Sequence, residues 1–179
     1  MKRETESEII PLGSTLPDFS LPATDGSTFD SSKIEIDKAF LVVFTCNHCP
    51  YVKGSEEQLV EIFSQFQSSG LSAIAISAND AEKYPDDSFE NMKLKTLPYP
   101  YLYDQSQQVA KSFDAACTPE CFLYNADKKL AYHGAINNSP NNPAGVTDVP
   151  LKSAIEALVA GNVPEKSFVH PVGCSIKWK

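Results

Sequence analysis

Two largely apolar runs predict the centre of a β-sheet. Residues 39–44 read Ala-Phe-Leu-Val-Val-Phe, with many β-branched and aromatic side chains, and residues 71–77 form a second buried-type run. Continuous apolar runs of this length are typical of strands that are buried on both faces. Between them, apolar residues recur at helical spacing from Val52 to Phe66, and Gly70 is suited to close that helix. This pattern predicts a strand, a helix and a second strand in succession.

The rest of the chain continues the alternation in shorter segments. Residues 16–29 surround the turn sequence Thr-Asp-Gly-Ser at 24–27 and predict a short N-terminal hairpin. Later segments predict, in chain order, a weak helix, a short strand, a helix, a hairpin and a closing helix: 81–96, 101–104, 105–114, 121–134 and 147–161. Thr147 or Asp148 is expected to cap the closing helix. Strands and helices that alternate in this way predict an α/β layer fold.

The length and the chain ends predict a single domain. The chain has 179 residues, which is one ordinary domain. We divide it into a flexible N-terminal segment, residues 1–15, and one domain over residues 16–179 that includes the C-terminal tail. Met1 to Glu8 lack the apolar core of a signal peptide. No apolar run approaches the roughly 20 residues of a membrane helix, and we therefore expect a cytoplasmic protein without a membrane partner.

The charge balance argues against a nucleic-acid partner. Lys and Arg total 15 against 23 for Asp and Glu, which gives a formal net charge of −8. Basic residues gather at Lys128-Lys129 and at Lys177 and Lys179, and no longer basic run occurs. Proteins that bind nucleic acids need a basic face to neutralise phosphates. We therefore expect no nucleic acid among the partners.

The cysteines indicate reactive thiols rather than a disulfide framework. There are five, an odd number, and two of them form the sequence Cys46-Asn47-His48-Cys49. In a reducing compartment, such thiols are more often catalytic or metal-binding than structural. The pair lies between a predicted buried strand and a predicted helix, a context that favours redox chemistry.

The position before a helix suggests a role for each residue of this motif. Unpaired N–H groups and the helix dipole stabilise an anion at a helix N-terminus, so we expect the pKa of Cys46 to lie below the usual value of about 8.5. Asn47 is a good N-cap residue, which leaves the first helical residue open. Cys49 is then the resolving thiol, and His48 can add positive charge near the Cys46 thiolate.

A metal site is the alternative that the residues leave open. Cys46 and Cys49 could form half of a zinc site, completed by Cys117 and Cys121 or by His133 or His170. The two histidines have no partner at metal-ligand spacing, and we interpret both as structural. The redox interpretation needs no metal and no cofactor beyond the thiols.

Several strings in the chain resemble those of a known family. They are Pro17-Asp18-Phe19-Ser20-Leu21, the apolar strand 39–44, Cys46-x-x-Cys49, Thr118-Pro119 and Phe122-Leu123-Tyr124. Together they resemble the thioredoxin superfamily, and within it the peroxiredoxin-like branch related to alkyl hydroperoxide reductase and thiol-specific antioxidant proteins. The longer strings 46–53, 116–120 and 173–179 resemble one group within that branch. The resemblance covers nearly the whole chain beyond residue 10.

The resemblance implies a fold and a docking site. It implies a thioredoxin-like fold, with a central mixed sheet flanked by helices, an N-terminal hairpin and a β-α insertion over residues 71–96. It also implies that Pro119 is a cis-proline that faces the cysteine pair. In this superfamily the backbone of the residue before it, here Thr118, pairs with an extended substrate segment beside the reactive sulfur.

The chain departs from both family patterns at residues that matter for chemistry. A peroxiredoxin aligns its peroxide-attacking cysteine with Cys49 and expects Thr or Ser at the position of Cys46 and Pro at that of Val42. It also needs a distal arginine, whereas the only arginine here is Arg3, and lysine does not reproduce the guanidinium fork. Thioredoxin's buried carboxylate is replaced by Phe40. A proton for the leaving Cys49 would therefore come from His48, our first candidate, or from Lys53, Glu56 or water.

These observations predict a thiol–disulfide oxidoreductase that acts in redox homeostasis. In this prediction Cys46 attacks, Cys49 resolves the mixed disulfide, and Thr118 and Pro119 shape the substrate groove. Cys117 and Cys174 are candidate auxiliary thiols, whereas Cys121 is expected to pack in the core. The partners would be a protein or small-molecule disulfide and a thiol reductant. The alternatives are an antioxidant thiol peroxidase that reduces hydroperoxides and, less favoured, a protein whose cysteines hold a metal.

Overall fold

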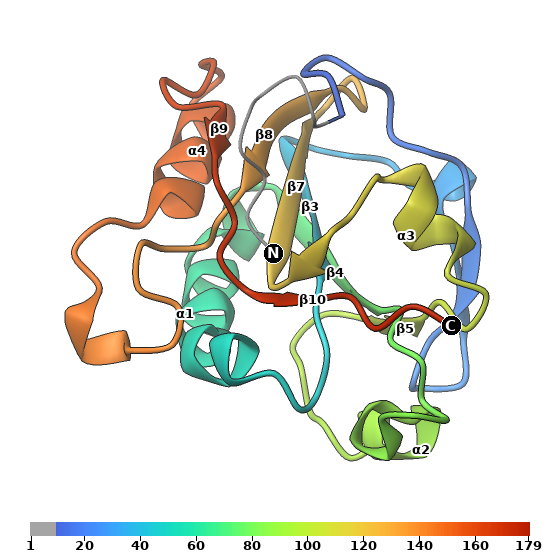
Figure 1. The fold of residues 1–179 in the computed structure, drawn as a ribbon. Coiled ribbons are helices and arrows are strands. Elements are labelled where there is room, and N and C mark those ends of the chain that lie inside the picture. The colour runs from blue at the N-terminus through green and yellow to red at the C-terminus, as the bar shows by residue number, and fades with distance from the viewer. Residues whose placement is uncertain (1–9) are drawn as a thin grey trace.

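The core of the molecule is a mixed sheet whose central strand carries the cysteine motif at its end. The computed structural model describes residues 10–179, and among these the sheet has the order β5-β4-β3-β7-β8-β9 (Figure 1). β3 pairs in parallel with β4 and antiparallel with β7. The strand bounds are β3 (Ala39–Phe44), β4 (Leu71–Ser77), β5 (Tyr101–Tyr103), β7 (Glu120–Asn125), β8 (Leu130–Gly134) and β9 (Phe168–Val169). The predicted central strand, the second strand and the late hairpin are confirmed.

The helices cover both faces of this sheet. α1 (Pro50–Phe66) and α4 (Pro150–Val159) lie on one face, and α3 (Gln108–Ser112) lies on the other with the N-terminal hairpin β1 (Ser20–Pro22) and β2 (Thr28–Asp30). β1 and β2 pair around the predicted turn, which confirms the N-terminal hairpin. The arrangement is an α/β thioredoxin-like fold with a central six-stranded mixed sheet flanked by helices.

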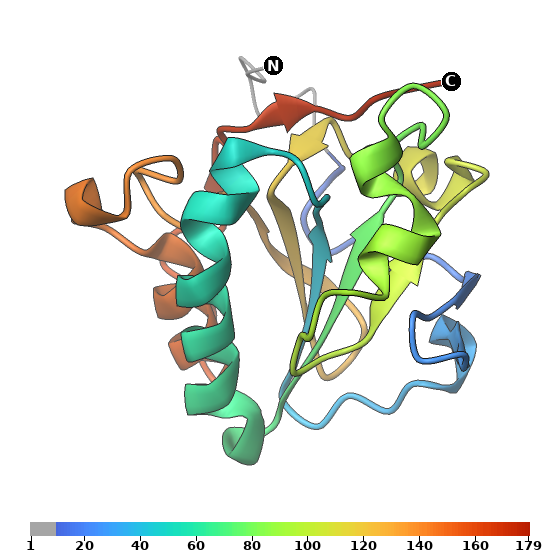
Figure 2. The ribbon, with the colours of Figure 1, turned by 90° about the horizontal axis from the view of Figure 1, so that it is seen from below.

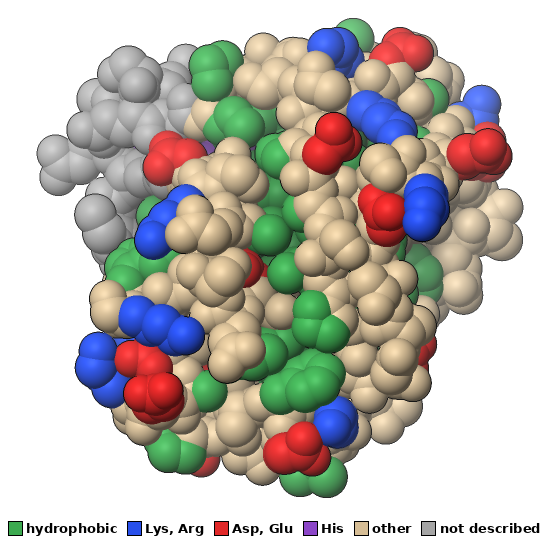
Figure 3. Space-filling model, turned by 90° about the vertical axis from the view of Figure 1, so that its right-hand side faces the viewer, with side chains coloured by type: hydrophobic (Ala, Val, Ile, Leu, Met, Phe, Trp, Pro, Cys, Tyr) green, Lys and Arg blue, Asp and Glu red, His purple; other side chains and the backbone are tan. Residues whose placement is uncertain are grey.

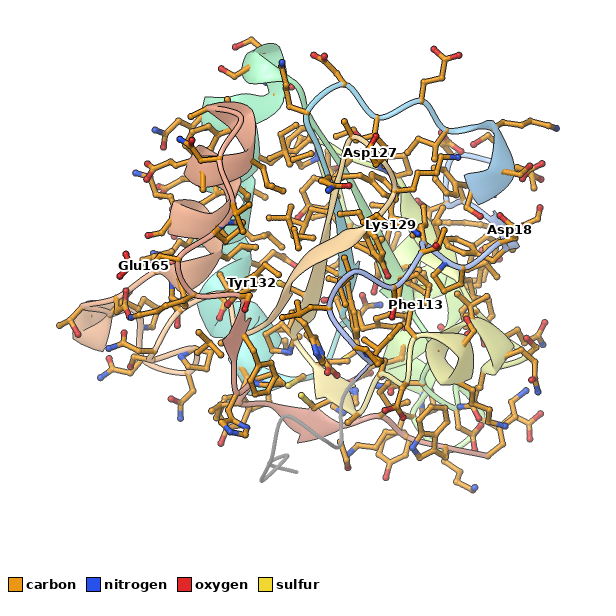
Figure 4. All side chains as sticks on the ribbon, turned by 90° about the horizontal axis from the view of Figure 1, so that it is seen from above. Asp18, Phe113, Asp127, Lys129, Tyr132 and Glu165 are labelled. Carbon is orange, nitrogen blue, oxygen red and sulfur yellow. The ribbon has the colours of Figure 1, made fainter. Side chains whose placement is uncertain are left out.

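The two faces explain why β3 has no polar residue. Alternate residues of a strand point to opposite faces, and here each face has its own core. Leu41 and Val43 pack with α1 and α4, whereas Val42 and Phe44 pack with α3 and the N-terminal segment. Figure 4 labels Tyr132 from the first core and Phe113 from the second, and they lie on opposite sides of the sheet.

Two predicted helices are much shorter than their patterns indicated. In the predicted helix 81–96, the structure has a 3₁₀ turn at Pro85–Asp87 and a single helical turn, α2 (Phe89–Met92). We attribute this to Asp87. Its side chain is fully buried, whereas one continuous helix on the surface would leave it in solvent. The expected insertion over 71–96 thus contains the sheet strand β4 and these short turns. The predicted helix 105–114 is confined to α3.

The caps of the longer helices also differ in part from expectation. Val149 is the N-cap of α4 and makes no side-chain capping bond, so neither Thr147 nor Asp148 caps it. Gly70 closes the end of the α1 segment after a 3₁₀ turn at Gln67–Ser69, with φ of 100°. That left-handed conformation suits glycine and confirms the predicted end.

Both ends of the described chain are joined to the domain. Near the start, the backbone of residues 13–16 exchanges hydrogen bonds with residues 128–130; the first nine residues of the expected flexible segment lie outside the described part. At the other end, β10 (Cys174–Ser175) pairs antiparallel with β6 (Cys117–Thr118). Figure 2 shows β10 crossing the end of the sheet at which α1 begins.

The surface on the side seen in Figure 3 has a mixed charge. Lysine side chains are interspersed with aspartate and glutamate there, without one continuous basic area. No helix in residues 10–179 is both long and apolar enough to cross a bilayer.

Candidate active site

The cysteine motif and the Thr118-Pro119 loop meet at one end of β3. The register pairs Phe44, the last residue of β3, with Glu120, the first residue of β7, so the loops beyond these residues are neighbours. The peptide bond between Thr118 and Pro119 is cis. Cys46 Sγ lies 3.4 Å from Thr118 Oγ1, and Cys49 Sγ lies 3.3 Å from the Thr118 carbonyl oxygen. Four of the predicted site residues are therefore brought together.

The helix begins later than the sequence indicated, and this changes which cysteine lies at its N-terminus. α1 starts at Pro50, and Cys49 is its N-cap with extended backbone angles. The prediction that Cys46 occupies this position, or that Asn47 caps the helix, is wrong. Proline at the first helical position explains the boundary, because its fixed φ favours that site and disfavours helical geometry in the residue before it.

The change of position reverses the expected acidities of the two thiols. A hydrogen bond from the Cys46 thiol, together with one from Cys174, lowers the pKa of Cys49 to about 4, although burial opposes this. The pKa of Cys46 is raised, because its proton is held in the bond to Cys49, because it is buried, and because Asp87 is nearby. The pKa of Cys46 thus shifts in the direction opposite to that expected from the sequence, and Cys49 is the more acidic of the two thiols; when it carries its proton, Cys49 Sγ can donate to the Thr118 carbonyl oxygen.

The carboxylate of Asp87 holds the loop of residues 46–49 in place through hydrogen bonds. This carboxylate is fully buried. Its Oδ1 accepts from the backbone N–H groups of Asn47 (2.7 Å) and His48 (3.2 Å). Its Oδ2 accepts from Nδ1 of His48 (2.5 Å) and Nδ2 of Asn79 (2.7 Å). Buried charged groups need such partners, so this network fixes the path of the loop that carries both cysteines.

His48 is held in place by Asp87 and by an aromatic ring. Its imidazole stacks on Tyr84, with centroids 5.4 Å apart and an interplanar angle of 11°. Nitrogen, sulfur and oxygen atoms of His48, Cys46 and Asp87 lie within 4.8 Å of one another. Among the described residues this is the group close enough to share a metal ion. It differs from the site considered above, in which Cys46 and Cys49 are completed by Cys117 and Cys121 or by His133 or His170. The oxygens of Asp87 already accept the N–H groups described above.

A second buried carboxylate supports the other loop. Glu120 Oε2 accepts from the backbone N–H groups of Ala116 (2.7 Å) and Cys117 (3.1 Å), and its Oε1 lies 2.6 Å from Nε2 of His133. Both side chains of this pair are fully buried. Glu120 therefore holds the backbone that leads into Thr118, and His133 has the structural role expected of it.

The other cysteines differ sharply in their surroundings. Cys117 and Cys121 are fully buried, and burial raises the pKa of Cys121 well above its usual range. Cys121 packs in the core as expected. Cys174, in contrast, is partly exposed and packs against the cluster of Cys46, Cys49 and Val52. Burial and the neighbouring Cys49 raise the pKa of Cys174 to about 11.

The sequence did not indicate Asp87, Asn79 or Glu120 as site residues. Asp87 lies 39 residues beyond His48, in a segment that the periodicity assigned to a helix. The only local signal was a pair of acidic residues after Pro85, which is common in exposed turns. Contacts between residues so far apart in the chain cannot be predicted from the local pattern of apolar and polar residues.

The acidity of Cys49 can be measured directly. We expect the ultraviolet thiolate absorbance of the reduced protein to persist as the pH falls from about 8.5 towards the folded-state pKa of about 4. Cys49→Ser should remove this low-pH signal, and Cys121→Ala should keep it. Because the pKa of Cys49 is lower in the folded than in the unfolded chain, this thiolate stabilises the fold above about pH 8.5, and the contribution is lost as the pH falls towards 4. A signal that survives in Cys49→Ser would assign the thiolate to another cysteine.

Comparison with known proteins places this site in a family context. The AhpC/TSA family model matches residues 12–133. An uncharacterized conserved protein from Geobacillus kaustophilus is 41% identical, with a TM-score of 0.88 over 94% of this chain and 93% of that one. A hypothetical protein from Sinorhizobium meliloti 1021 is 34% identical, with a TM-score of 0.89 over 99% of this chain and 97% of that one. No curated protein matches the sequence significantly.

More distant structures agree in fold alone. The structure described as a putative thiol:disulfide interchange protein DsbE from Chlorobium tepidum is 16% identical, with a TM-score of 0.63 over 85% of this chain and 97% of that one. This supports the thioredoxin-like architecture. The family model covers more than half of the chain, from the N-terminal hairpin through β8. The chain therefore belongs to the AhpC/TSA family.

Proposed function

We propose that the protein is a thiol–disulfide oxidoreductase that acts in cytoplasmic redox homeostasis. The observation that carries the proposal is the pair Cys46 and Cys49 beside the cis peptide bond at Pro119, with Cys49 as the N-cap of α1. A thiolate is the reactive form of cysteine, and a helix N-terminus stabilises it. Cys46 lies where it can complete an internal disulfide with that thiolate.

The proposed reaction has two exchange steps. The Cys49 thiolate attacks one sulfur of a substrate disulfide, which forms a mixed disulfide and releases the other substrate sulfur as a thiolate. Cys46 then loses its proton and attacks Cys49 Sγ, which forms the Cys46–Cys49 disulfide and releases the second substrate thiolate. An external thiol reductant supplies the two electrons that restore both cysteines. The order of the two cysteines is thus opposite to that expected from the sequence.

His48 is the residue that we assign to receive the proton of Cys46. One of its ring nitrogens lies within 4.8 Å of Cys46 Sγ. Asp87 accepts a hydrogen bond from Nδ1 and so orients the ring. This is the role that an orienting carboxylate has beside a histidine base. Phe40 occupies the position of thioredoxin's buried carboxylate, and in this proposal Asp87 provides a carboxylate from a different part of the chain.

A thiol peroxidase is the second candidate, and the acidity of Cys49 favours it. In that reaction the Cys49 thiolate attacks the O–O bond of a hydroperoxide, releases an alcohol and becomes a sulfenic acid. Cys46 then displaces water to form the disulfide. The described residues contain no arginine to hold the peroxide oxygens, and a lysine does not provide the same paired donors. We therefore rank disulfide exchange first.

Rates with two substrates decide between these functions. Catalytic amounts of the full chain should accelerate the reduction of insulin disulfides by glutathione by about 100-fold or more over glutathione alone. Oxidation of the reduced protein by hydrogen peroxide should be no faster than that of a small thiol with the same pKa. Fast peroxide oxidation without insulin reduction would instead establish the peroxidase.

A further inference from the structure

The C-terminal tail occupies the edge beside Pro119. β10 pairs antiparallel with β6, so that Cys174 is opposite Thr118 and Ser175 is opposite Cys117. The backbone N–H of Ile176 donates to the Ala116 carbonyl oxygen (3.0 Å). The tail therefore forms a short strand against the backbone that leads to the cis bond, and Figure 2 shows it crossing this end of the sheet.

The approach of the tail to Thr118 is too close for a side chain at position 173. A Cβ atom on Gly173 would lie 2.1 Å from the carbonyl oxygen of Thr118. Glycine thus permits the tail backbone to run directly over the docking residue. Any larger residue would push the strand away from this edge.

Contacts beyond Cys174 hold the tail in register. Ile176 is almost completely buried and packs in the second core. Lys177 donates its backbone N–H to Asn79 Oδ1 (2.8 Å), and its carbonyl oxygen accepts from the N–H of Asp80 (2.8 Å) and Nε2 of Gln107 (3.0 Å). The tail is thus a built-in strand rather than a loose end.

The pairing of β10 with β6 resembles the way in which an extended substrate segment would bind to an enzyme. In β-augmentation, an extended segment adds to an exposed strand edge through main-chain hydrogen bonds. Here the added segment is part of the same chain, and its cysteine packs against the cluster that holds Cys46 and Cys49. Both of these sulfurs are buried, with at most 1% of either residue exposed. An external disulfide therefore reaches them only when the surroundings move.

We propose that residues 173–177 are an internal substrate strand, which masks the docking edge and places Cys174 to exchange disulfides with Cys49. This inference rests on the proposed function, and it adds a third redox cysteine and a regulatory segment to it. When the strand is seated, the edge is closed to external peptides. When it lifts, the edge and the thiols become accessible.

The exchange step is balanced without an added oxidant once the Cys46–Cys49 disulfide exists. The Cys174 thiolate attacks Cys49 Sγ, the Cys46–Cys49 bond breaks, and Cys46 leaves as a thiolate. The proton that Cys174 loses is taken up by Cys46, so that one disulfide and one thiol are present before and after. The reverse reaction, in which Cys46 attacks Cys49, returns Cys174 as a thiol.

Disulfide mapping tests this proposal. The reduced full chain is treated with oxidised glutathione, quenched in acid, alkylated and analysed by mass spectrometry without reduction. The wild type should contain both Cys46–Cys49 and Cys49–Cys174 linkages. Cys46→Ser should contain Cys49–Cys174 and carry about ten-fold less glutathione on Cys49 than Cys46→Ser/Cys174→Ser, since Cys174 already packs against the cluster that holds Cys49. Cys121→Ala, in the core, should match the wild type.

The outcomes separate this inference from the proposed function. Glutathione that stays on Cys49 in Cys46→Ser, with no link to Cys174, would overturn the inference even if the wild type forms Cys46–Cys49 and reduces insulin. A wild type that neither forms Cys46–Cys49 nor reduces insulin would overturn the proposed function. The Cys46→Ser result tests Cys174 in either case, because it does not depend on turnover.

A variant of the tail backbone tests the masking. Gly173→Ala should lower the yield of Cys49–Cys174, because its Cβ displaces the strand from Thr118. It should also raise the rate with a disulfide-bonded extended peptide several-fold. Val172→Ala changes an exposed tail residue and is the control that should behave as the wild type. Equal peptide rates in Gly173→Ala and Val172→Ala would overturn the masking.

Discussion

Cys49→Ser will reduce the turnover of a disulfide substrate by about 1,000-fold or more, because it removes the reacting thiolate. The hydroxyl of serine has the same position at the start of α1 but is not ionised. Cys46 and Cys174 lower the pKa of Cys49 by donating hydrogen bonds to it. Because these two thiols keep their protons, neither replaces Cys49 as the reacting thiolate. The measurement is the steady-state reduction of insulin disulfides at neutral pH.

Cys46→Ser distinguishes the two thiols of the motif. Combined with Cys174→Ser, it should still react once with a disulfide substrate but stop at a mixed disulfide on Cys49, because neither candidate resolving thiol remains. Peptide mass spectrometry locates the trapped substrate. Cys121→Ala is the matched control, since its thiol lies in the core. A substrate trapped on Cys46 in the Cys49→Ser variant would contradict the order of attack proposed above.

Asp87→Ala will destabilise the fold by about 3–5 kcal/mol, the range measured when one partner of a buried polar or ionic group is removed. The loss follows from the N–H donors of Asn47, His48 and Asn79 that the carboxylate satisfies. Each buried donor left without an acceptor costs about 1–3 kcal/mol. Denaturant unfolding monitored by the fluorescence of Trp178 or by circular dichroism gives the free energy of unfolding.

Two further variants identify the cause of that loss. Asp86→Ala changes an exposed neighbour, of which only the backbone oxygen binds the cysteine loop, and its effect should stay within about 0.5 kcal/mol. Asp87→Asn keeps the shape of the side chain but turns an amide NH₂ group towards other donors. Its loss of stability should lie between those of Asp86→Ala and Asp87→Ala. Equal stabilities for Asp86→Ala and Asp87→Ala would show that the network does not hold the loop.

The main elements of the sheet could be predicted because their patterns are local. The run 39–44 is apolar throughout, and the structure places its alternate residues in two separate cores. The helical spacing from Val52 to Phe66 is equally direct, since one face of α1 packs on β3 and β4. The turn at 24–27 carries glycine where φ is 88°. Each of these features is decided within a few residues.

The start of α1 and the short segments depend on contacts that are distant in sequence. The motif alone fits a helix that begins at Cys46 or at Asn47. Pro50, together with the hydrogen bonds to Asp87, determines where α1 begins. The stretch 81–96 has apolar residues at helical spacing, but burial of Asp87 bends it into separate turns. β10 has only two residues, too few to show any period. These are the parts of the candidate site that required the structure.

The pairing of β10 with β6 also sets a threshold for any peptide that arrives from solution. A segment attached to the same chain through a short span is present at its binding edge at an effective concentration of about a millimolar. A free peptide of equal intrinsic affinity at micromolar concentration would occupy that edge about 1,000-fold less often. Unfolded chains at micromolar concentration would then rarely displace the strand, whereas a disulfide substrate supplied at high concentration would still react. The partners that succeed would be those whose own extended segment makes contacts that residues 173–177 lack, so the selectivity of the protein would lie in its last few residues.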